Sequence, residues 1–252
     1  MKIFLSLAII LLTTCSPSAE ANASSQVIDF ASTNTATNKY VRLSMRMLEA
    51  TKNGSDLTGI LNELAAIPFD DLVTSLDTKN KKLAFWINTY NGFVQLDLVK
   101  NPESFKDKDE FYKGQRHKIA GILMSFDNME HGILRNSRVK LSLGYLKRWF
   151  VKDWEKKLRN TDIDGRIHFA LNCGAKSCPP IALFNDVGFD KQINAVVTQY
   201  LENYTTIEGD MIKTSPLFSW FRGDFGGKKG IVKFLRRFGV VLDNDVKYSV
   251  EF

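Results

Sequence analysis

The chain has 252 residues, of which 44% are hydrophobic and 25% are charged, and its formal net charge is +6. This length suits one large domain or two small ones, and the composition is that of an ordinary globular protein. The basic residues are spread along the chain without a nucleic-acid-binding motif or an alternation with aromatic residues, so we expect no nucleic-acid partner. Weak attraction to anionic surfaces is the alternative, through the clusters at 147–148 and 228–237.

Residues 1–23 are predicted to be a secretory signal segment. Lys2 provides a positive start, the apolar run IFLSLAIILL is too short for a stable membrane anchor, and Ala21-Asn22-Ala23 is a small-residue cleavage pattern. The alternative is a lipobox at residues 12–15, in which Cys15 would be lipidated and would associate the protein with a membrane. We therefore expect a periplasmic or secreted protein, with a lipid-anchored envelope lipoprotein as the alternative.

Export would leave Cys173 and Cys178 as the two free thiols of the chain, because Cys15 is either removed or capped by lipid. The expected compartment is oxidising, and disulfides persist there.

The predicted elements follow a polar, flexible leader at residues 24–38. The spacing of apolar residues predicts helices over 39–52, 57–66, 69–75, 79–100, 142–158, 190–204, 216–223 and 228–238. The helix over 79–100 is apolar on most faces and should therefore run through the core. Hairpins are expected over 111–126 and 206–214, and a buried strand over 167–171. Residues 39–252 should form a single, predominantly helical α+β domain with a few short antiparallel strands.

Two amides stand out in the long helix. Asn88 and Asn91 are three residues apart and therefore share one face of an otherwise apolar helix. Buried amides need hydrogen-bond partners. They either anchor a neighbouring loop, or orient a catalytic group or bind a substrate backbone.

A second group of polar residues follows Asp127, which is the expected N-cap of a helix with Glu130 in a capping box. Arg135 lies four residues after His131 and should lower its pKa if the two side chains are close. Adjacent helical residues point in different directions, so Glu130 should not easily orient His131. His131 is either a hydrogen-bonded core histidine or a catalytic one, and Glu130 either a catalytic group or a solvated helix start.

The third group is HFALNCGAKSCPPI, residues 168–181. On a strand, His168 and Asn172 would point the same way, just before Cys173, and these are the side chains of papain-like nucleophilic catalysis. Pro179 is expected to begin a helix, which would place Cys178 at a helix N-terminus, where a thiolate is favoured.

Two other uses of these sulfurs are open. His131, His168, Cys173 and Cys178 would make a Cys2His2 zinc set, but their spacing is wider than that of a zinc knuckle, so no metal and no cofactor is expected. A disulfide between Cys173 and Cys178 closes a short loop and gains less than the ~3 kcal/mol of a longer loop. Such a disulfide is better explained as redox-active or regulatory than as a structural staple.

Three stretches together resemble the domain of unknown function 547. They are AFWINTYNGFVQ at 84–95, DNMEHGILR at 127–135 and IHFALNCGAKSCPPI at 167–181, and the resemblance spans roughly residues 70–200. It implies that Glu130-His131 is the acidic-histidine pair of the family and that Cys173 and Cys178 are its two cysteines. Some eukaryotic relatives are joined to a glutaredoxin module, which implies thiol chemistry only by association. The family is also similar to papain-like and transglutaminase-like enzymes, which implies a related fold.

The leading hypothesis is an exported cysteine-dependent hydrolase or acyl-transferase that acts on amide or ester bonds of an unknown peptide or small-molecule substrate. Cys173 would be the nucleophile, with Cys178 as the alternative, and His131 or His168 the base. The residues expected to orient these groups or to stabilise an oxyanion are Asn172, Asn88, Asn91 and Arg135. The alternatives are a non-enzymatic envelope binding module and a thiol-redox protein with a Cys173–Cys178 disulfide.

Overall fold

The structure is a computed structural model, and it describes residues 36–175, 178–240 and 248–252. The predicted signal segment, with Cys15, lies outside the described residues, as does most of the predicted leader. The last three leader residues are nonetheless part of the fold. Ala36 is buried, and the backbone N–H and hydroxyl of Thr37 donate to the Asp186 carboxylate at 3.0 and 2.6 Å. The folded region therefore extends back at least to Ala36.

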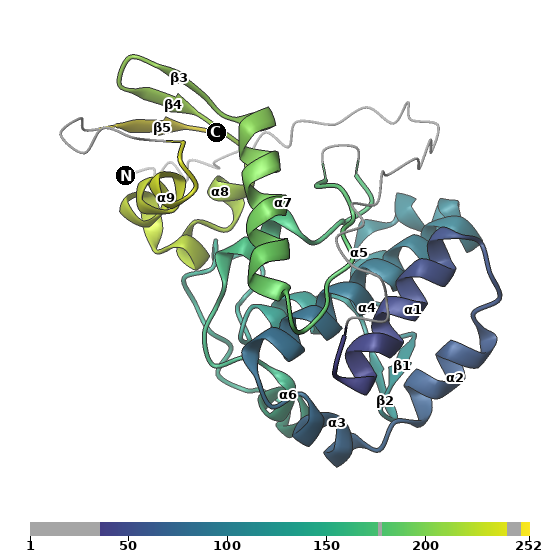
Figure 1. The fold of residues 1–252 in the computed structure, drawn as a ribbon. Helices are drawn as coiled ribbons and strands as arrows, with labels where there is room; N and C mark the ends of the chain where they lie inside the picture. The colour runs from purple at the N-terminus through teal and green to yellow at the C-terminus, as the bar shows by residue number, and fades with distance from the viewer. Residues whose placement is uncertain (1–35, 176–177, 241–247) are drawn as a thin grey trace, which may run out of the picture.

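The order of elements is that of a mostly helical α+β domain (Figure 1). The helices are α1 (Lys39–Lys52), α2 (Thr58–Ala66), α3 (Phe69–Ser75), α4 (Lys79–Lys100), α5 (Lys108–Lys113), α6 (Asp153–Leu158), α7 (Phe189–Tyr204), α8 (Leu217–Trp220) and α9 (Gly227–Arg237). Tighter 3-10 turns are η2 (Pro102–Lys106), η4 (Gly165–Phe169) and η5 (Arg222–Phe225), and η3 (Asn128–Leu134) is a π-helix. The short strands are β1 (His117–Ile119), β2 (Ile122–Met124), β3 (Thr206–Glu208), β4 (Met211–Lys213) and β5 (Ser249–Glu251). The predicted fold class is confirmed.

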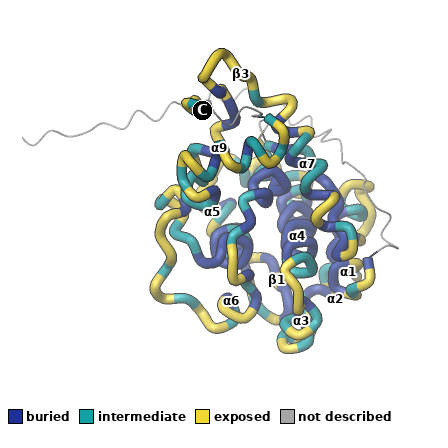
Figure 2. Tube along the Cα trace, turned by 60° about the vertical axis from the view of Figure 1, so that its left-hand side comes forward, coloured by how far each residue is buried: buried dark blue, intermediate teal, exposed yellow. Residues whose placement is uncertain are grey.

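Helix α4 runs through the core, as predicted (Figure 2). It begins where the Thr78 side chain accepts the Lys81 N–H at 3.3 Å, and it ends at Asn101 before a proline. Buried residues occupy most of its faces, and α1 lies along it. A methyl group on Gly92 would come within 3.2 Å of the Met47 side chain, so glycine permits this close approach.

Both predicted hairpins are present. Strands β1 and β2 are antiparallel and joined by Ala120 and Gly121, whose φ angles of 49° and 77° are those of a tight hairpin turn. Strands β3 and β4 form the second antiparallel pair, and β5 joins β4 in parallel. The parallel strand was not predicted, because nothing local in a short C-terminal segment indicates its partner.

Two apolar clusters form the interior, and η4 connects them. Ile167 belongs to the large cluster around α4, whereas Phe169 belongs to a smaller aromatic cluster under α8, η5 and α9. The side chain of His168, between them in sequence, is almost completely buried. The strand predicted over 167–171 is therefore wrong. A 3-10 turn forms because the Asp164 side chain caps it by accepting the Arg166 N–H at 3.1 Å.

The helix predicted over 142–158 is also wrong, because only α6 is helical there. Leu143 and Gly144 adopt positive φ angles of 51° and 89°, which interrupt a helix. The Leu143 carbonyl instead accepts the Gly223 N–H at 2.7 Å, so a distant contact overrides the local apolar spacing.

None of the helices within 36–175, 178–240 and 248–252 is long and apolar enough to cross a membrane.

Candidate functional site

The π-helix η3 carries the predicted acidic-histidine pair, and its start differs from the prediction. Ser125 and Asn128 cap it reciprocally: the Ser125 Oγ accepts the Asn128 N–H and the Asn128 Oδ1 accepts the Ser125 N–H, both at 3.1 Å. The capping box predicted for Asp127 and Glu130 is therefore wrong by two residues. The carboxylates of Asp127 and Glu130 are free for other contacts.

Backbone bonds five residues apart define the π-helix: the Arg135 N–H donates to the Glu130 carbonyl at 2.8 Å and the Ser137 N–H to the Gly132 carbonyl at 2.7 Å. The geometry brings the Glu130 Oε1 within 3.5 Å of the His131 Nδ1, although adjacent residues were predicted to point apart. π-Helical turns are rare and frequently occur at functional sites.

His131 is held in its neutral form. Its Nδ1 lies 2.8 Å from the Arg135 Nη1, and since a guanidinium only donates, Nδ1 must accept this bond. The ring proton is then on Nε2, 3.6 Å from the Asp127 Oδ1. Burial, and secondarily the charge of Arg135, lowers the pKa of His131 to about 3, as the predicted proximity of Arg135 implied. At neutral pH, His131 can donate from Nε2 but cannot accept a proton at the occupied Nδ1.

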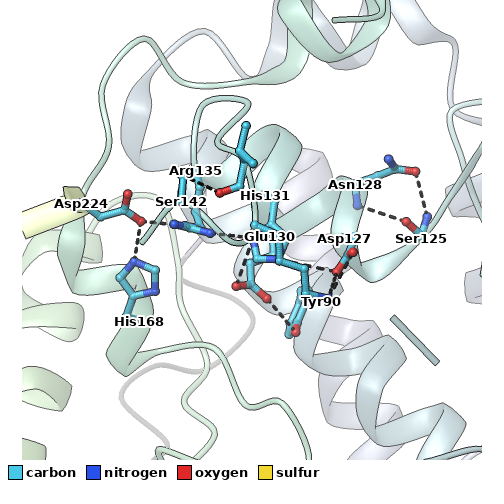
Figure 3. A network of polar contacts seen from close by, with 12 residues as sticks. Tyr90, Ser125, Asp127, Asn128, Glu130, His131, Arg135, Ser142, His168 and Asp224 are labelled. Carbon is cyan, nitrogen blue, oxygen red and sulfur yellow. Dashed lines mark hydrogen bonds and ion pairs between the residues drawn. The ribbon is translucent and has the colours of Figure 1, made fainter. Parts of the chain in front are cut away.

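Arg135 connects His131 to a buried carboxylate (Figure 3). The Arg135 Nε donates to the Asp224 Oδ2 at 2.6 Å, and the His168 Nε2 donates to the same oxygen at 2.9 Å. The side chains of Arg135 and Asp224 are fully buried. His131, Arg135, Asp224 and His168 therefore form one continuous chain of polar contacts, which we call the buried network.

The charges within the buried network follow from its contacts. Burial lowers the pKa of His168, and the bond to Asp224 opposes this only in part, so His168 is a neutral donor. Burial acts to raise the pKa of Asp224, but the bonds from His168 and Arg135 outweigh it and the pKa lies below its usual value. Arg135 is thus the counter-charge of an ionised Asp224.

Phe221, one residue before η5, covers the buried network. The His168 ring stacks on the Phe221 ring at a centroid distance of 3.7 Å and an angle of 11°, and the Arg135 guanidinium lies 4.6 Å from the same ring. Among the described residues, the Arg135 Nη2 and the Asp224 Oδ1 have no hydrogen-bond partner.

Sequence reasoning missed Asp224, which lies 89 positions from Arg135 and outside the three motifs.

Glu130 is the partly exposed end of the polar region. The Tyr90 hydroxyl donates to the Glu130 Oε2 at 3.2 Å, and burial raises the pKa of Tyr90 well above its usual value, so this hydroxyl stays protonated. Asp127 pairs with the Lys140 Nζ at 3.0 Å. Two carboxylates and a neutral imidazole thus lie together at one face of η3.

The amides of α4 bind backbone. The Asn88 Oδ1 accepts the Phe184 N–H at 3.0 Å and its Nδ2 donates to the Phe184 carbonyl at 2.7 Å. The Asn91 Oδ1 accepts the Asn172 N–H at 2.9 Å and its Nδ2 donates to the Ala170 carbonyl at 2.8 Å. Both side chains are fully buried. They hold the chain on either side of the cysteines, which is the loop-anchoring role that the sequence left open.

Cys173 and Cys178 form a disulfide, with their Cα atoms 6.1 Å apart. The Cys178 Sγ accepts the Cys173 N–H at 3.2 Å. Asn172 closes the loop by donating to the Pro179 carbonyl at 2.9 Å and by accepting the Gly174 N–H at 3.0 Å. The helix predicted to begin at Pro179 is absent, so Cys178 does not lie at a helix N-terminus. The two prolines continue instead as irregular chain.

The predicted grouping of His168, Asn172 and Cys173 does not form. His168 contacts Asp224, whereas Asn172 binds within the cysteine loop. Across the described residues, no hydrogen bond joins a histidine to either cysteine sulfur.

Tyr112 links the cysteine loop to the η3 residues. Its hydroxyl donates to the Cys173 carbonyl at 2.7 Å. Burial first, and then the charges of Glu130 and Asp127, raise the pKa of Tyr112 well above its usual value, so the hydroxyl stays a donor. Tyr112 therefore contacts the cysteine loop and lies within electrostatic range of the η3 carboxylates.

A metal centre is not evident in the described part of the chain, where no three histidine, cysteine or acidic side chains gather as metal ligands would.

The fold and the site define a class: a helical α+β domain with a disulfide loop and a buried network of polar side chains that begins on a π-helix. The family model described as "Protein of unknown function, DUF547" matches residues 73–201, just over half of the chain, and the chain belongs to this family. The resemblance seen in the three motifs is thus confirmed, while Asp224 lies beyond the matched range. Neither the curated proteins nor the solved structures contain a match.

Proposed function

We propose that this chain is a thiol-redox protein whose reactive group is the Cys173–Cys178 disulfide. The observation that supports the proposal most directly is that the two cysteines are joined while both remain partly exposed. A soluble thiol can approach a sulfur only when it is accessible, so exposure is a requirement of thiol–disulfide exchange.

The surroundings of the loop argue against a purely structural staple. Asn91 and Tyr112 already bind the backbone of Asn172 and Cys173, and Asn172 bonds across the loop to Pro179. The bridged cysteines are separated by five positions, and so short a loop gains little entropy from closure. The covalent bond adds little to a loop that its hydrogen bonds already hold.

The proposed reaction reduces the protein disulfide and oxidises a substrate dithiol. A substrate thiolate attacks the Cys173 Sγ, the bond to the Cys178 Sγ breaks, and Cys178 leaves as a thiolate. The second substrate thiol then displaces Cys173, so two electrons and two protons move from the substrate to the two protein thiols. Cys178 is the better leaving group because its sulfur accepts the Cys173 N–H, a bond that stabilises a thiolate.

The test is a redox titration of the full chain in glutathione buffers, with free thiols counted by alkylation and mass spectrometry. We expect both thiols to appear together while the fold is retained, at a potential above the roughly −300 mV below which structural disulfides lie. Brief exposure to reduced glutathione should give an adduct on Cys173 in preference to Cys178. A disulfide that resists the buffer, or one whose reduction unfolds the protein, contradicts the proposal.

A second candidate function is cysteine-dependent hydrolysis or acyl transfer, for which the observation is that Tyr112 contacts the cysteine loop and lies within electrostatic range of the η3 carboxylates. In the reduced protein, the Cys173 thiolate would attack the carbonyl carbon of an amide or ester, and the His131 Nε2–H would donate a hydrogen bond to the oxyanion. The amine or alcohol would leave with a proton from water, and the acyl group would stay on the Cys173 Sγ as a thioester until water or an acceptor takes it. After reduction, Cys173→Ala should abolish turnover of such substrates, with Cys178→Ala as its matched control. Normal turnover by both variants would exclude this candidate, and would leave redox exchange or a binding module.

The redox candidate gains support from the predicted export, because an oxidising compartment preserves the disulfide, whereas the hydrolase candidate needs a reduced Cys173. A mature chain that begins after Ala23 is the expected result of N-terminal sequencing, whereas a retained Met1 contradicts a periplasmic or secreted location.

A further inference from the structure

The segment before α6 exposes an unusual amount of apolar surface. We call residues 138–152 the 138–152 loop. Leu141, Trp149 and Phe150 are 90%, 93% and 95% exposed, and much of the chain leading into α6 is exposed (Figure 2). Leu143, Tyr145 and Leu146 in the same loop are also exposed. Isolated exposed apolar residues are ordinary, but a group within one short segment marks an interaction surface.

The charges of the 138–152 loop all have one sign. The sequence from 138 to 152 contains no acidic residue, and its basic residues are Arg138, Lys140, Lys147, Arg148 and Lys152. Lys140 and Arg148 pair with Asp127 and Glu155 outside the loop. Lys147 and Lys152 are exposed and lie on either side of Trp149 and Phe150 in sequence. The apolar side chains are therefore set among positive charges.

The 138–152 loop has a defined backbone. Arg138 and Lys147 form an antiparallel bridge, and the Val139 N–H donates to the Leu146 carbonyl at 2.9 Å. A Cβ atom at Gly144 would lie 2.2 Å from the Asp224 Oδ1, so only glycine allows the loop to approach η5 this closely. The exposed side chains thus project from a loop that is fixed against the buried network.

We propose that the 138–152 loop docks on an anionic lipid surface, with Leu141, Trp149 and Phe150 entering the headgroup region and the basic residues contacting lipid phosphates. Aromatic residues prefer the membrane–water interface, and neighbouring lysine and arginine residues are attracted to anionic headgroups. The uniform positive charge favours this occupant over a second copy of the chain, since two copies of the loop would repel each other. The proposal is independent of the proposed redox function.

The test measures binding of the full chain to phosphatidylcholine vesicles with and without phosphatidylglycerol, by co-sedimentation at low and high salt. We expect binding that requires the anionic lipid and weakens with salt. Trp149→Ser with Phe150→Ser should weaken it at least about tenfold. The matched control is Trp220→Ser, which removes a 55% exposed tryptophan outside the loop and should bind like the unaltered chain. Lys147→Glu with Lys152→Glu should abolish the preference for anionic vesicles.

Three outcomes would overturn the proposal. If the unaltered chain and both loop variants bind vesicles equally, another segment is responsible for membrane binding, such as the N-terminal residues that all of them share. Equal binding to neutral and anionic vesicles would remove the role of the charges. A self-associating chain that becomes monomeric on Trp149→Ser with Phe150→Ser, without vesicle binding, would make a second copy the occupant. The substituted side chains are exposed, so circular dichroism should show an unchanged fold.

Discussion

Replacing Arg135 with methionine is expected to destabilise the protein by about 3–5 kcal/mol, because the change leaves the carboxylate of Asp224 buried without its counter-charge. Both side chains are fully buried and the Arg135 Nε lies 2.6 Å from the Asp224 Oδ2. Methionine has a similar length and fills much of the same space, so the loss is mainly electrostatic. Urea unfolding, followed by circular dichroism, measures the change in the free energy of unfolding.

The control for Arg135→Met is Arg46→Met. Arg46 pairs with Glu63 at 3.3 Å, but both side chains are about half exposed, and exposed pairs contribute about 0–1 kcal/mol. A second substitution, Asp224→Asn in the Arg135→Met background, should restore part of the lost stability. The neutral amide needs no counter-charge, and its oxygen still accepts a hydrogen bond from the His168 Nε2–H. If Arg135→Met costs no more than Arg46→Met, Asp224 is not held as a buried anion.

The buried network shows which contacts of Arg135 can be predicted from the sequence and which cannot. The contact of His131 with Arg135 was predictable, because four residues separate them within one helical segment. Asp224 was not, because its place beside Arg135 and His168 depends on how η5 returns to the core. The carboxylate that fixes the charge of the network thus comes from outside the motifs that indicate the family.

The long helix and the hairpins could be predicted because their signals are local: apolar spacing, a capping threonine and a turn glycine. Asn88 and Asn91 stood out as amides on an apolar helix, but the segments they bind lie roughly 80 to 96 positions away and have no local signature. The prediction of a helix over 142–158 is wrong for the opposite reason. Its apolar spacing suggests a buried helical face, whereas Trp149 and Phe150 are exposed. Apolar periodicity identifies an amphipathic segment without saying whether a core or an external surface will cover it.

For the cysteine loop, the sequence indicated one feature and misplaced another. Its disulfide was one of the alternatives that the number of thiols and the expected compartment left open, and the structure contains it. The helix N-terminus expected to activate Cys178 is absent, and the Cys178 Sγ instead accepts the backbone N–H of Cys173. In the proposed redox function this N–H would stabilise the Cys178 thiolate, the role that the prediction gave to a helix N-terminus.

The stability of the protein is expected to fall as the pH drops from about 6.5 towards 3, with His131 as a main cause. An unfolded histidine binds a proton near pH 6.5, whereas burial and Arg135 lower the pKa of folded His131 to about 3. Between these values the unfolded state binds one more proton than the folded state, so each pH unit lost costs up to about 1.4 kcal/mol. Above pH 6.5 neither state is protonated at this residue, so the titration of His131 no longer lowers the stability.

His131→Gln tests this assignment, because glutamine can still accept the Arg135 bond but cannot titrate. Urea unfolding between about pH 5 and 6.5, mostly above the range in which unfolded carboxylates titrate, should show a slope smaller by up to about one proton for the variant. The control is His117→Gln: burial also lowers the pKa of His117, but Asp97, 3.2 Å away, opposes the shift. The reduction in slope should therefore be larger for His131→Gln. An unchanged slope in His131→Gln would mean that folded His131 takes up its proton at a normal pH, and would place its imidazole in a more polar environment than the Arg135 contact implies.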